Sequence, residues 1–182
     1  MLYEIFSLLL NVAATLFGGA CLLRLYMQHQ RLSFGNPIGR FVFALTNWLV
    51  LPLRRVLPAV GRWDTASAVA AYLIELLQVV LIWAVLGAAT ASAVLLPLLA
   101  VFGLLRLVIS SMTVLVIVGA VLSWVRADSP MADLVERLCA PLLRPFRRVI
   151  PLVGGIDLSP LALLVLLQVV GIVLNGLQHA VT

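Results

Sequence analysis

The sequence contains no lysine and few charges of either sign. Its basic residues are twelve arginines, and charged residues make up only 10% of the chain. Hydrophobic residues make up 64%, and the mean hydropathy is +1.19. Because a soluble domain has about 25% charged residues, this balance excludes an ordinary soluble protein and predicts an integral membrane protein. The 182 residues leave room for a few spanning helices but not for an additional soluble catalytic domain.

Residues that bind metals or act in catalysis are also scarce. Cys21 and Cys139 have no CxxC spacing, and His29 and His179 fall on opposite sides of the membrane in the topology predicted below. No Gly-rich phosphate loop, paired carboxylates at one depth or Ser/His/Asp set is recognisable. We therefore expect no catalytic residue, metal site or cofactor, and no enzyme activity. The net charge of +5 points to anionic lipid headgroups and not to nucleic acid, because the arginines lack interleaved aromatics.

Long apolar runs predict an all-α protein with spanning helices. The stretch between residues 65 and 125 is too long for one helix and too short for three, and GAATAS at 87–92 is the best break. The apolar segment that follows contains Pro97 and Gly103 and would reach roughly 50 Å, so it must tilt, kink or lie partly on the surface. The four predicted spans are at about 5–23, 66–86, 100–125 and 158–178.

The arginines predict the orientation of these spans. Six lie in the connection between the first two spans and five in the connection between the last two, while Arg106 lies elsewhere. The positive-inside rule places both connections in the cytoplasm, so both termini are expected on the opposite side. A five-span alternative would send one Arg-rich connection outward.

The chain also contains an internal repeat. LPLRRVLPAVGRWD at 51–64 corresponds to RPFRRVIPLVGGID at 144–157, with an offset of 93 residues and no gaps. We expect repeats at 1–90 and 91–182, related about the membrane normal because each crosses the membrane twice. The shared positions to which we assign structural roles are Pro52, Pro58, Gly61 and Asp64 in the first copy, and Pro145, Pro151, Gly154 and Asp157 in the second.

Each cytoplasmic connection is expected to contain a short amphipathic helix, at about 37–50 and 130–143. Asn36-Pro37 and Ser129-Pro130 each place a capping side chain before a proline at the first helical position. The apolar stripe of each helix either faces acyl chains at the membrane interface or packs on the protein's own spans. The stripes consist of Ile38, Phe41, Val42, Leu45 and Leu49, and of Met131, Leu134, Val135, Leu138 and Leu142.

Two arginine pairs, Arg54-Arg55 and Arg147-Arg148, stand between prolines. Because proline opposes helix, we expect both pairs on stiff extended or turning segments at the cytoplasmic interface. Guanidinium groups there would bind lipid phosphates, or alternatively a specific anionic ligand or partner protein. Asp64 and Asp157 would stand at the start of the next span, where an Arg–Asp bridge within each copy is a further option.

Glu75 is the outstanding polar candidate within a predicted span. It lies about ten residues into the second span, roughly 15 Å deep and near the bilayer midplane. Its repeat equivalent is Gln168. Glu75 either is neutral and hydrogen-bonded to Gln168, Gln78 or Asn11, or has an ion or proton role. Arg106 is expected to reach the outer interface and not to pair with Glu75.

The stretches PLRRVLPAVGRWD, SWVRADSP and PLLRPFRRVIPLVGGIDLSP, together with the duplication, resemble the YggT family of small bacterial and plastid membrane proteins over nearly the whole chain. The first copy departs from the second at Arg62-Trp63 and at 65–67. The resemblance implies a bacterial inner (cytoplasmic) membrane location. Together with the orientation predicted from the arginines, this location places both termini in the periplasm. The resemblance also implies loose links to osmotic or ion homeostasis, cell-division gene neighbourhoods and plastid cytochrome assembly, without a settled activity.

We therefore expect a non-enzymatic scaffold or assembly factor that supports envelope or membrane-complex homeostasis, including under osmotic stress. Its expected partners are anionic lipids and another membrane protein, and a homo-oligomer is compatible with the sequence. The alternative is a potassium or proton transporter or channel component that uses Glu75. Transport needs a hydrated path past this carboxyl, and the small number of pore-lining polar residues favours the scaffold.

Overall fold

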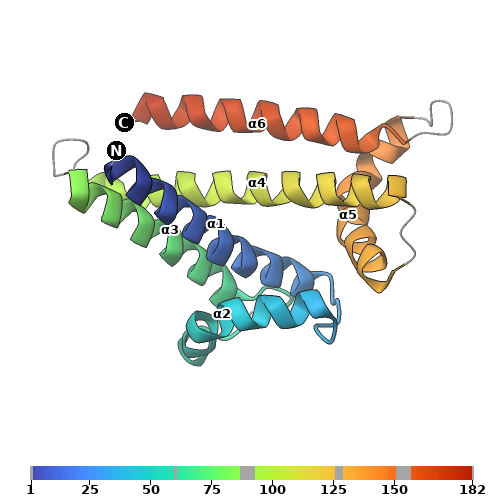
Figure 1. Cartoon of the computed structure of the whole chain (residues 1–182), viewed down its shortest axis with the longest axis horizontal. Coiled ribbons are helices and arrows are strands. Elements are labelled where there is room, and N and C mark those ends of the chain that lie inside the picture. The colour runs from blue at the N-terminus through green and yellow to red at the C-terminus, as the bar shows by residue number, and fades with distance from the viewer. Residues whose placement is uncertain (1, 60, 87–92, 126–128, 151–156, 182) are drawn as a thin grey trace. The chain divides into compact units, whose positions relative to one another are not determined.

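The computed structural model describes residues 2–59, 61–86, 93–125, 129–150 and 157–181. These residues form six α-helices and a short 3-10 helix, η1, at Ala93–Leu95. The all-α prediction is therefore confirmed for the described residues. The α-helices are α1 (Leu2–His29), α2 (Pro37–Val56), α3 (Thr65–Leu86), α4 (Leu96–Val125), α5 (Pro130–Val149) and α6 (Ser159–Val181), as shown in Figure 1.

Four of these helices, α1, α3, α4 and α6, are long and apolar enough to cross a membrane. They match the four predicted spans and support a multi-pass membrane protein. Helix α4 is continuous over 30 residues, or about 45 Å. Pro97 lies in its first turn, where a missing backbone N–H leaves no intrahelical bond unmade.

The chain divides into two compact units, one made of residues 1–108 with 178–182 and the other of residues 109–177. Helix α4 contributes to both units. We call them the first unit and the second unit. The repeat boundary predicted at residues 90 and 91, and the parallel relation of the repeats, stay predictions.

In the first unit, α1 packs along α3, and α2 packs against both (Figure 1). Their shared core contains small side chains, which allow close helix approach in a membrane. Leu104 of α4 packs against the same core. The core residues are Cys21, Val50, Ala66, Ala70 and Ala71.

Helices α2 and α5 begin as predicted. The Asn36 side chain accepts a hydrogen bond from the Gly39 N–H (2.7 Å), and the Ser129 hydroxyl accepts one from the Ala132 N–H (3.2 Å). These contacts satisfy backbone donors that the first turn of a helix leaves unpaired. The capping function predicted for Asn36 and Ser129 is therefore confirmed.

The ends of these two helices differ from the prediction. Both continue past residues 50 and 143, so the arginine pairs lie on helix and not on extended segments. Pro52 and Pro145 lie inside the helices. The helices continue past them, since each proline lacks only its own N–H donor and the backbone hydrogen bonds resume after it. Leu57 N–H donates to the Leu53 carbonyl (2.8 Å), and the corresponding bond in the second copy, from Ile150, is 2.9 Å long.

The apolar stripes of α2 and α5 are partly covered by the protein itself. On α2, Val42 is buried whereas Phe41 is 58% exposed. On α5, Leu134, Val135 and Leu138 are all buried. The stripes thus contribute to packing, and their placement at a membrane interface stays a prediction.

Gly61 lies in the turn between α2 and α3 with φ of +62°, in the left-handed region that favours glycine. A side chain at this position would strain the turn that brings the chain back to α3. The corresponding Gly154, together with Pro151, lies outside the described residues.

Candidate functional site

A buried group of charged and polar side chains joins α1, α2 and the start of α3 in the first unit. We call it the Arg24–Asp64 cluster. Arg24 comes from the C-terminal part of α1, and Asp64 immediately precedes α3. Both side chains are almost fully buried, at 2% and 0% exposure. The members of the cluster are Arg24, Gln28, Thr46, Asn47, Arg54, Asp64 and Ser67.

Arg24 connects α1 to α2. Its Nη1 donates to Thr46 Oγ1 (2.8 Å) and to Asn47 Oδ1 (2.9 Å). Its guanidinium lies 4.7 Å from the ring centre of Phe43, in cation–π range. Arg24 Nε is buried and 3.8 Å from Asp64 Oδ2, which makes an ion pair but not a hydrogen bond.

Asp64 is the centre of the cluster. Its Oδ1 accepts a hydrogen bond from Arg54 Nε (3.3 Å), and its Oδ2 accepts from Arg54 Nη2 (2.5 Å) and Ser67 Oγ (2.6 Å). Burial by itself would raise the pKa of this carboxyl, but the hydrogen bonds from Arg54 and Ser67 outweigh burial and hold the pKa below its usual value. Asp64 is therefore a charged carboxylate that binds two arginines, Arg24 and Arg54. Arg54 also donates a hydrogen bond to Gln28 Oε1 (2.9 Å).

In the described part of the second copy, only the central pair is retained. Arg147 Nε donates to Asp157 Oδ2 (2.8 Å), and these side chains are 46% and 28% exposed. Partial burial raises the pKa of Asp157, but hydrogen bonds from Ser159 and Arg147 more than offset this effect and leave the pKa below its usual value. At the 93-residue offset, Arg24, Thr46 and Asn47 of the first copy correspond to Ile117, Cys139 and Ala140.

The two arginines of each predicted pair have different surroundings. Arg54 and Arg147 bind aspartates in the same copy, so the Arg–Asp bridges considered in the sequence analysis are confirmed. Arg55 and Arg148 are exposed. The lipid or partner-binding role predicted for all four residues stays a prediction. It suits Arg55 and Arg148 best, because they are exposed and take no part in these two bridges.

Among the proline positions of the repeat, Pro58 also contacts the start of α3. Its carbonyl accepts a hydrogen bond from Thr65 Oγ1 (2.9 Å). This bond, the left-handed Gly61 and the Arg54–Asp64 pair together fix the turn from α2 into α3.

Glu75 lies apart from this cluster, in the middle of α3. Its side chain is 7% exposed, and among the described residues no hydrogen bond or ion pair reaches it. Two predicted partners, Gln78 and Asn11, hydrogen-bond to each other instead. The predicted pairing with Gln168, an exposed residue of the second unit, stays a prediction.

Arg106 also follows the expectation that it does not pair with Glu75. Its Nη2 donates to Oε1 of Gln178, near the end of α6. This contact lies within the first unit.

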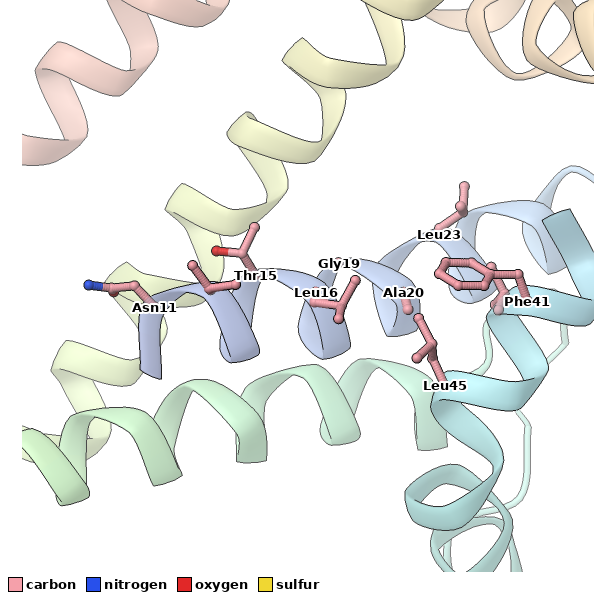
Figure 2. A pocket seen from close by; sticks show the side chains of 10 residues that line it. Asn11, Thr15, Leu16, Gly19, Ala20, Leu23, Phe41 and Leu45 are labelled. Carbon is pink, nitrogen blue, oxygen red and sulfur yellow. The ribbon is translucent and has the colours of Figure 1, made fainter. Parts of the chain in front are cut away.

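An open groove of about 550 Å³ runs along the exposed side of α1 in the first unit. Figure 2 shows Asn11, Thr15 and Gly19 following one another along α1, with Phe41 and Leu45 of α2 at the far end of the groove. The groove is mainly apolar, with Asn11 and Thr15 as its exposed polar side chains. Its lining suits an apolar surface, such as a helix or an acyl chain, better than a polar ligand.

Arg24 was not predicted as a functional residue, because the first span was expected to end at about residue 23. Helix α1 in fact continues to His29, so Arg24 lies within an apolar helix. An arginine inside such a helix is a signal for a buried polar partner. Thr46 and Asn47 gave no comparable signal, because their role depends on a contact with a helix far away in the sequence.

Known proteins are similar to this chain over most of its length. The profile of the CCB3/YggT family matches residues 3–85 and again residues 98–178. An Escherichia coli protein called uncharacterized protein YggT is 36% identical over 169 residues, covering 90% of this chain and 86% of that one. An uncharacterized Pseudomonas aeruginosa protein is 35% identical over 173 residues, covering 93% of this chain and 88% of that one. No solved structure matches. With this double match and these relatives, the chain belongs to the CCB3/YggT family.

Proposed function

We propose that the protein is a non-enzymatic scaffold or assembly factor of the bacterial inner membrane, which supports envelope or membrane-complex homeostasis. The observation that carries the proposal is the Arg24–Asp64 cluster. Its charged side chains bind one another and fix three helices, so they build a rigid unit in place of an open site for a small polar ligand. A rigid unit of this kind suits a protein that holds partners in position.

The surfaces left for partners support the same proposal. The groove on α1 offers apolar contacts with Asn11 and Thr15 as hydrogen-bonding groups, which is the composition that helix association in membranes uses. With the repeats parallel and both termini periplasmic, α2 and α5 lie at the cytoplasmic interface. Arg55 and Arg148 are then available to anionic headgroups or to a partner.

Site-specific photo-crosslinking in intact cells tests the scaffold directly. A photoreactive residue at Thr15 or at Phe41 would report on the groove, and one at Arg55 on the cytoplasmic face. The matched control is Leu161 of α6, which is 57% exposed but lies outside the groove. We expect discrete protein adducts from the groove or from Arg55 that are absent at Leu161. The same adducts at every exposed position, or none at any of them, would contradict the proposal.

Ion transport is the second candidate, because Glu75 is a buried carboxyl within a spanning helix. Neither the groove on α1 nor a second cavity of about 230 Å³ between α1, α2 and α3 includes Glu75 in its lining. Potassium, sodium and proton flux into liposomes, compared for the wild type and Glu75→Gln at equal incorporation, separates the candidates. The scaffold predicts no flux from either protein, whereas flux that disappears in the variant would favour transport.

A further inference from the structure

The carboxyl of Glu75 lies where three helices of the first unit meet. Its Oε2 faces Gly103 of α4, where an added Cβ would also lie 3.4 Å from Glu75 Cδ. Its Oε1 lies 4.0 Å from the position that a Cβ would have on Gly18 of α1. Two glycines, one on each neighbouring helix, thus leave the room that this carboxyl occupies.

The surroundings of Glu75 offer little to stabilise a negative charge. The groups shown to face its carboxyl on the neighbouring helices are two glycines, Gly18 on α1 and Gly103 on α4. Arg106 is the charged group that acts on it electrostatically, but the two groups do not form an ion pair within 4.0 Å. On α3 itself, Tyr72 donates its hydroxyl hydrogen to the Pro97 carbonyl (3.3 Å).

An unpaired carboxylate buried among helices is costly, and such a group either finds a partner or takes up a proton. A metal ion is a poor candidate for the partner. Among the residues that the structure describes, no group of three or more His, Cys, Asp or Glu side chains is placed to hold one. A sodium or potassium ion would likewise need several oxygen ligands, and the side-chain amides of Gln78 and Asn11 bind each other.

We propose that Glu75 is a proton-binding site within the membrane and that its neutral form is the one packed between Gly18 and Gly103. Release of the proton would place a charge in this contact and weaken the contact of Glu75 with Gly103 on α4. The site requires neither transport nor a scaffold role, because a bound proton can control helix packing without crossing the membrane. The equivalent Gln168 has a neutral amide that does not titrate, so the proposed site belongs to the first copy alone.

The first test compares the thermal stability of the wild type and Glu75→Gln, as full chains in lipid nanodiscs, from mildly acidic to alkaline buffer. Glutamine has nearly the same shape and stays neutral. We therefore expect the two proteins to melt together in acid and the wild type to melt at progressively lower temperature than the variant as the pH rises. A melting difference that does not change with pH would overturn the proposal.

The second test identifies the protonated residue without any substitution. Dicyclohexylcarbodiimide is an apolar reagent that reacts with protonated carboxyls in membranes, and mass spectrometry locates the adduct. We expect labelling of Glu75 that declines as the pH rises, with Asp133 and Glu136, which are exposed on α5, as unlabelled internal controls. Labelling of these two residues to the same extent as Glu75 would contradict a special proton site.

Discussion

The two copies of the repeat contain the same Arg–Asp pair at the same spacing, yet the pair has different surroundings in each. In the first copy, Asp64 is fully buried and receives hydrogen bonds from Arg54 and Ser67, with Arg24 close by. In the second copy, Asp157 is 28% exposed, and Arg147 is its single arginine partner among the described residues. We therefore expect the same Arg–Asp pair to contribute differently to the free energy of unfolding in the two copies, because its burial and its neighbouring side chains differ.

The largest expected difference concerns the two aspartates. Asp64→Asn removes the carboxylate that offsets the charge of Arg24, which is 2% exposed, so we expect a loss of about 3–5 kcal/mol in unfolding free energy. Asp157→Asn breaks a partly exposed pair, and we expect a loss below about 1 kcal/mol. Equilibrium unfolding of both variants in the same detergent measures the two values. Equal losses would show that burial does not distinguish the copies.

Close glycine contacts allow a second comparison of the units. An added Cβ at Gly119 would lie 2.6 Å from Cys139 Sγ, and one at Gly103 would meet Glu75. We expect Gly119→Ala and Gly103→Ala each to cost about 1–3 kcal/mol through overpacking. Loss of melting temperature in purified protein would report both effects.

These glycine variants have direct controls. A Cβ at Gly171 of α6 meets nothing within 4 Å, so Gly171→Ala is expected to be neutral or stabilising by up to about 1 kcal/mol. Truncating the opposing side chain, with Cys139→Ala for Gly119→Ala or Glu75→Ala for Gly103→Ala, is expected to recover part of the loss. If the double variants are no more stable than the glycine variants, the proposed contacts are wrong.

Lysine substitutions make the comparison sharper at the arginine pairs. Arg54 uses two nitrogens on Asp64 and also binds Gln28, a geometry that a lysine ammonium cannot reproduce. We expect Arg54→Lys to cost about 1–2 kcal/mol. Arg147→Lys, which replaces a single bond at an exposed pair, is expected to stay within about 0.5 kcal/mol of the wild type.

The exposed arginines complete this test. Arg55→Lys and Arg148→Lys are expected to leave stability unchanged and to weaken binding to vesicles of anionic lipid only modestly, because lysine keeps the charge. Vesicle flotation with the four single variants measures binding, and thermal unfolding measures stability. If Arg55→Lys destabilised the protein as much as Arg54→Lys, the division between arginines that bind an aspartate and arginines that do not would fail.

A last expected difference between the copies concerns the dependence of stability on acid. The pKa values of both carboxyls are lowered in the folded state, so their stabilisation is fully present above the unfolded value of about 3.9 and is lost as the pH falls through the folded value. Because Asp64 is the more deeply buried residue, Asp64→Asn should remove more of the acid sensitivity than Asp157→Asn. Unfolding curves below pH 5, recorded for both variants and the wild type, check this order. The reverse order would contradict it.

Much of the architecture was accessible from the sequence because it depends on local patterns. The four spans follow from runs of apolar residues, and the starts of α2 and α5 follow from Asn36 and Ser129, whose capping bonds reach only three residues along the chain. The prolines were misleading, because Pro52 and Pro145 were treated as helix breakers although backbone hydrogen bonds resume after each.

The candidate site was only partly predictable. Arg54 and Asp64 were identified from the repeat, and their bridge was one of the options considered. Arg24 lies 40 residues before Asp64 in the sequence, and its role appears only when α1, α2 and α3 are packed together. The difference between the copies was also hidden, because Ile117 and Ala140 look like ordinary apolar residues until they are aligned with the members of the cluster.

The most direct test of the account is a pair of double-mutant cycles at matching positions, Arg54→Met with Asp64→Asn and Arg147→Met with Asp157→Asn. Each cycle isolates the coupling within one copy of the same pair. We predict a coupling energy above about 1 kcal/mol for the buried first copy and below about 0.5 kcal/mol for the exposed second copy. Equal coupling energies, or a larger one in the second copy, would contradict the claim that the first unit is held together by its buried ion cluster.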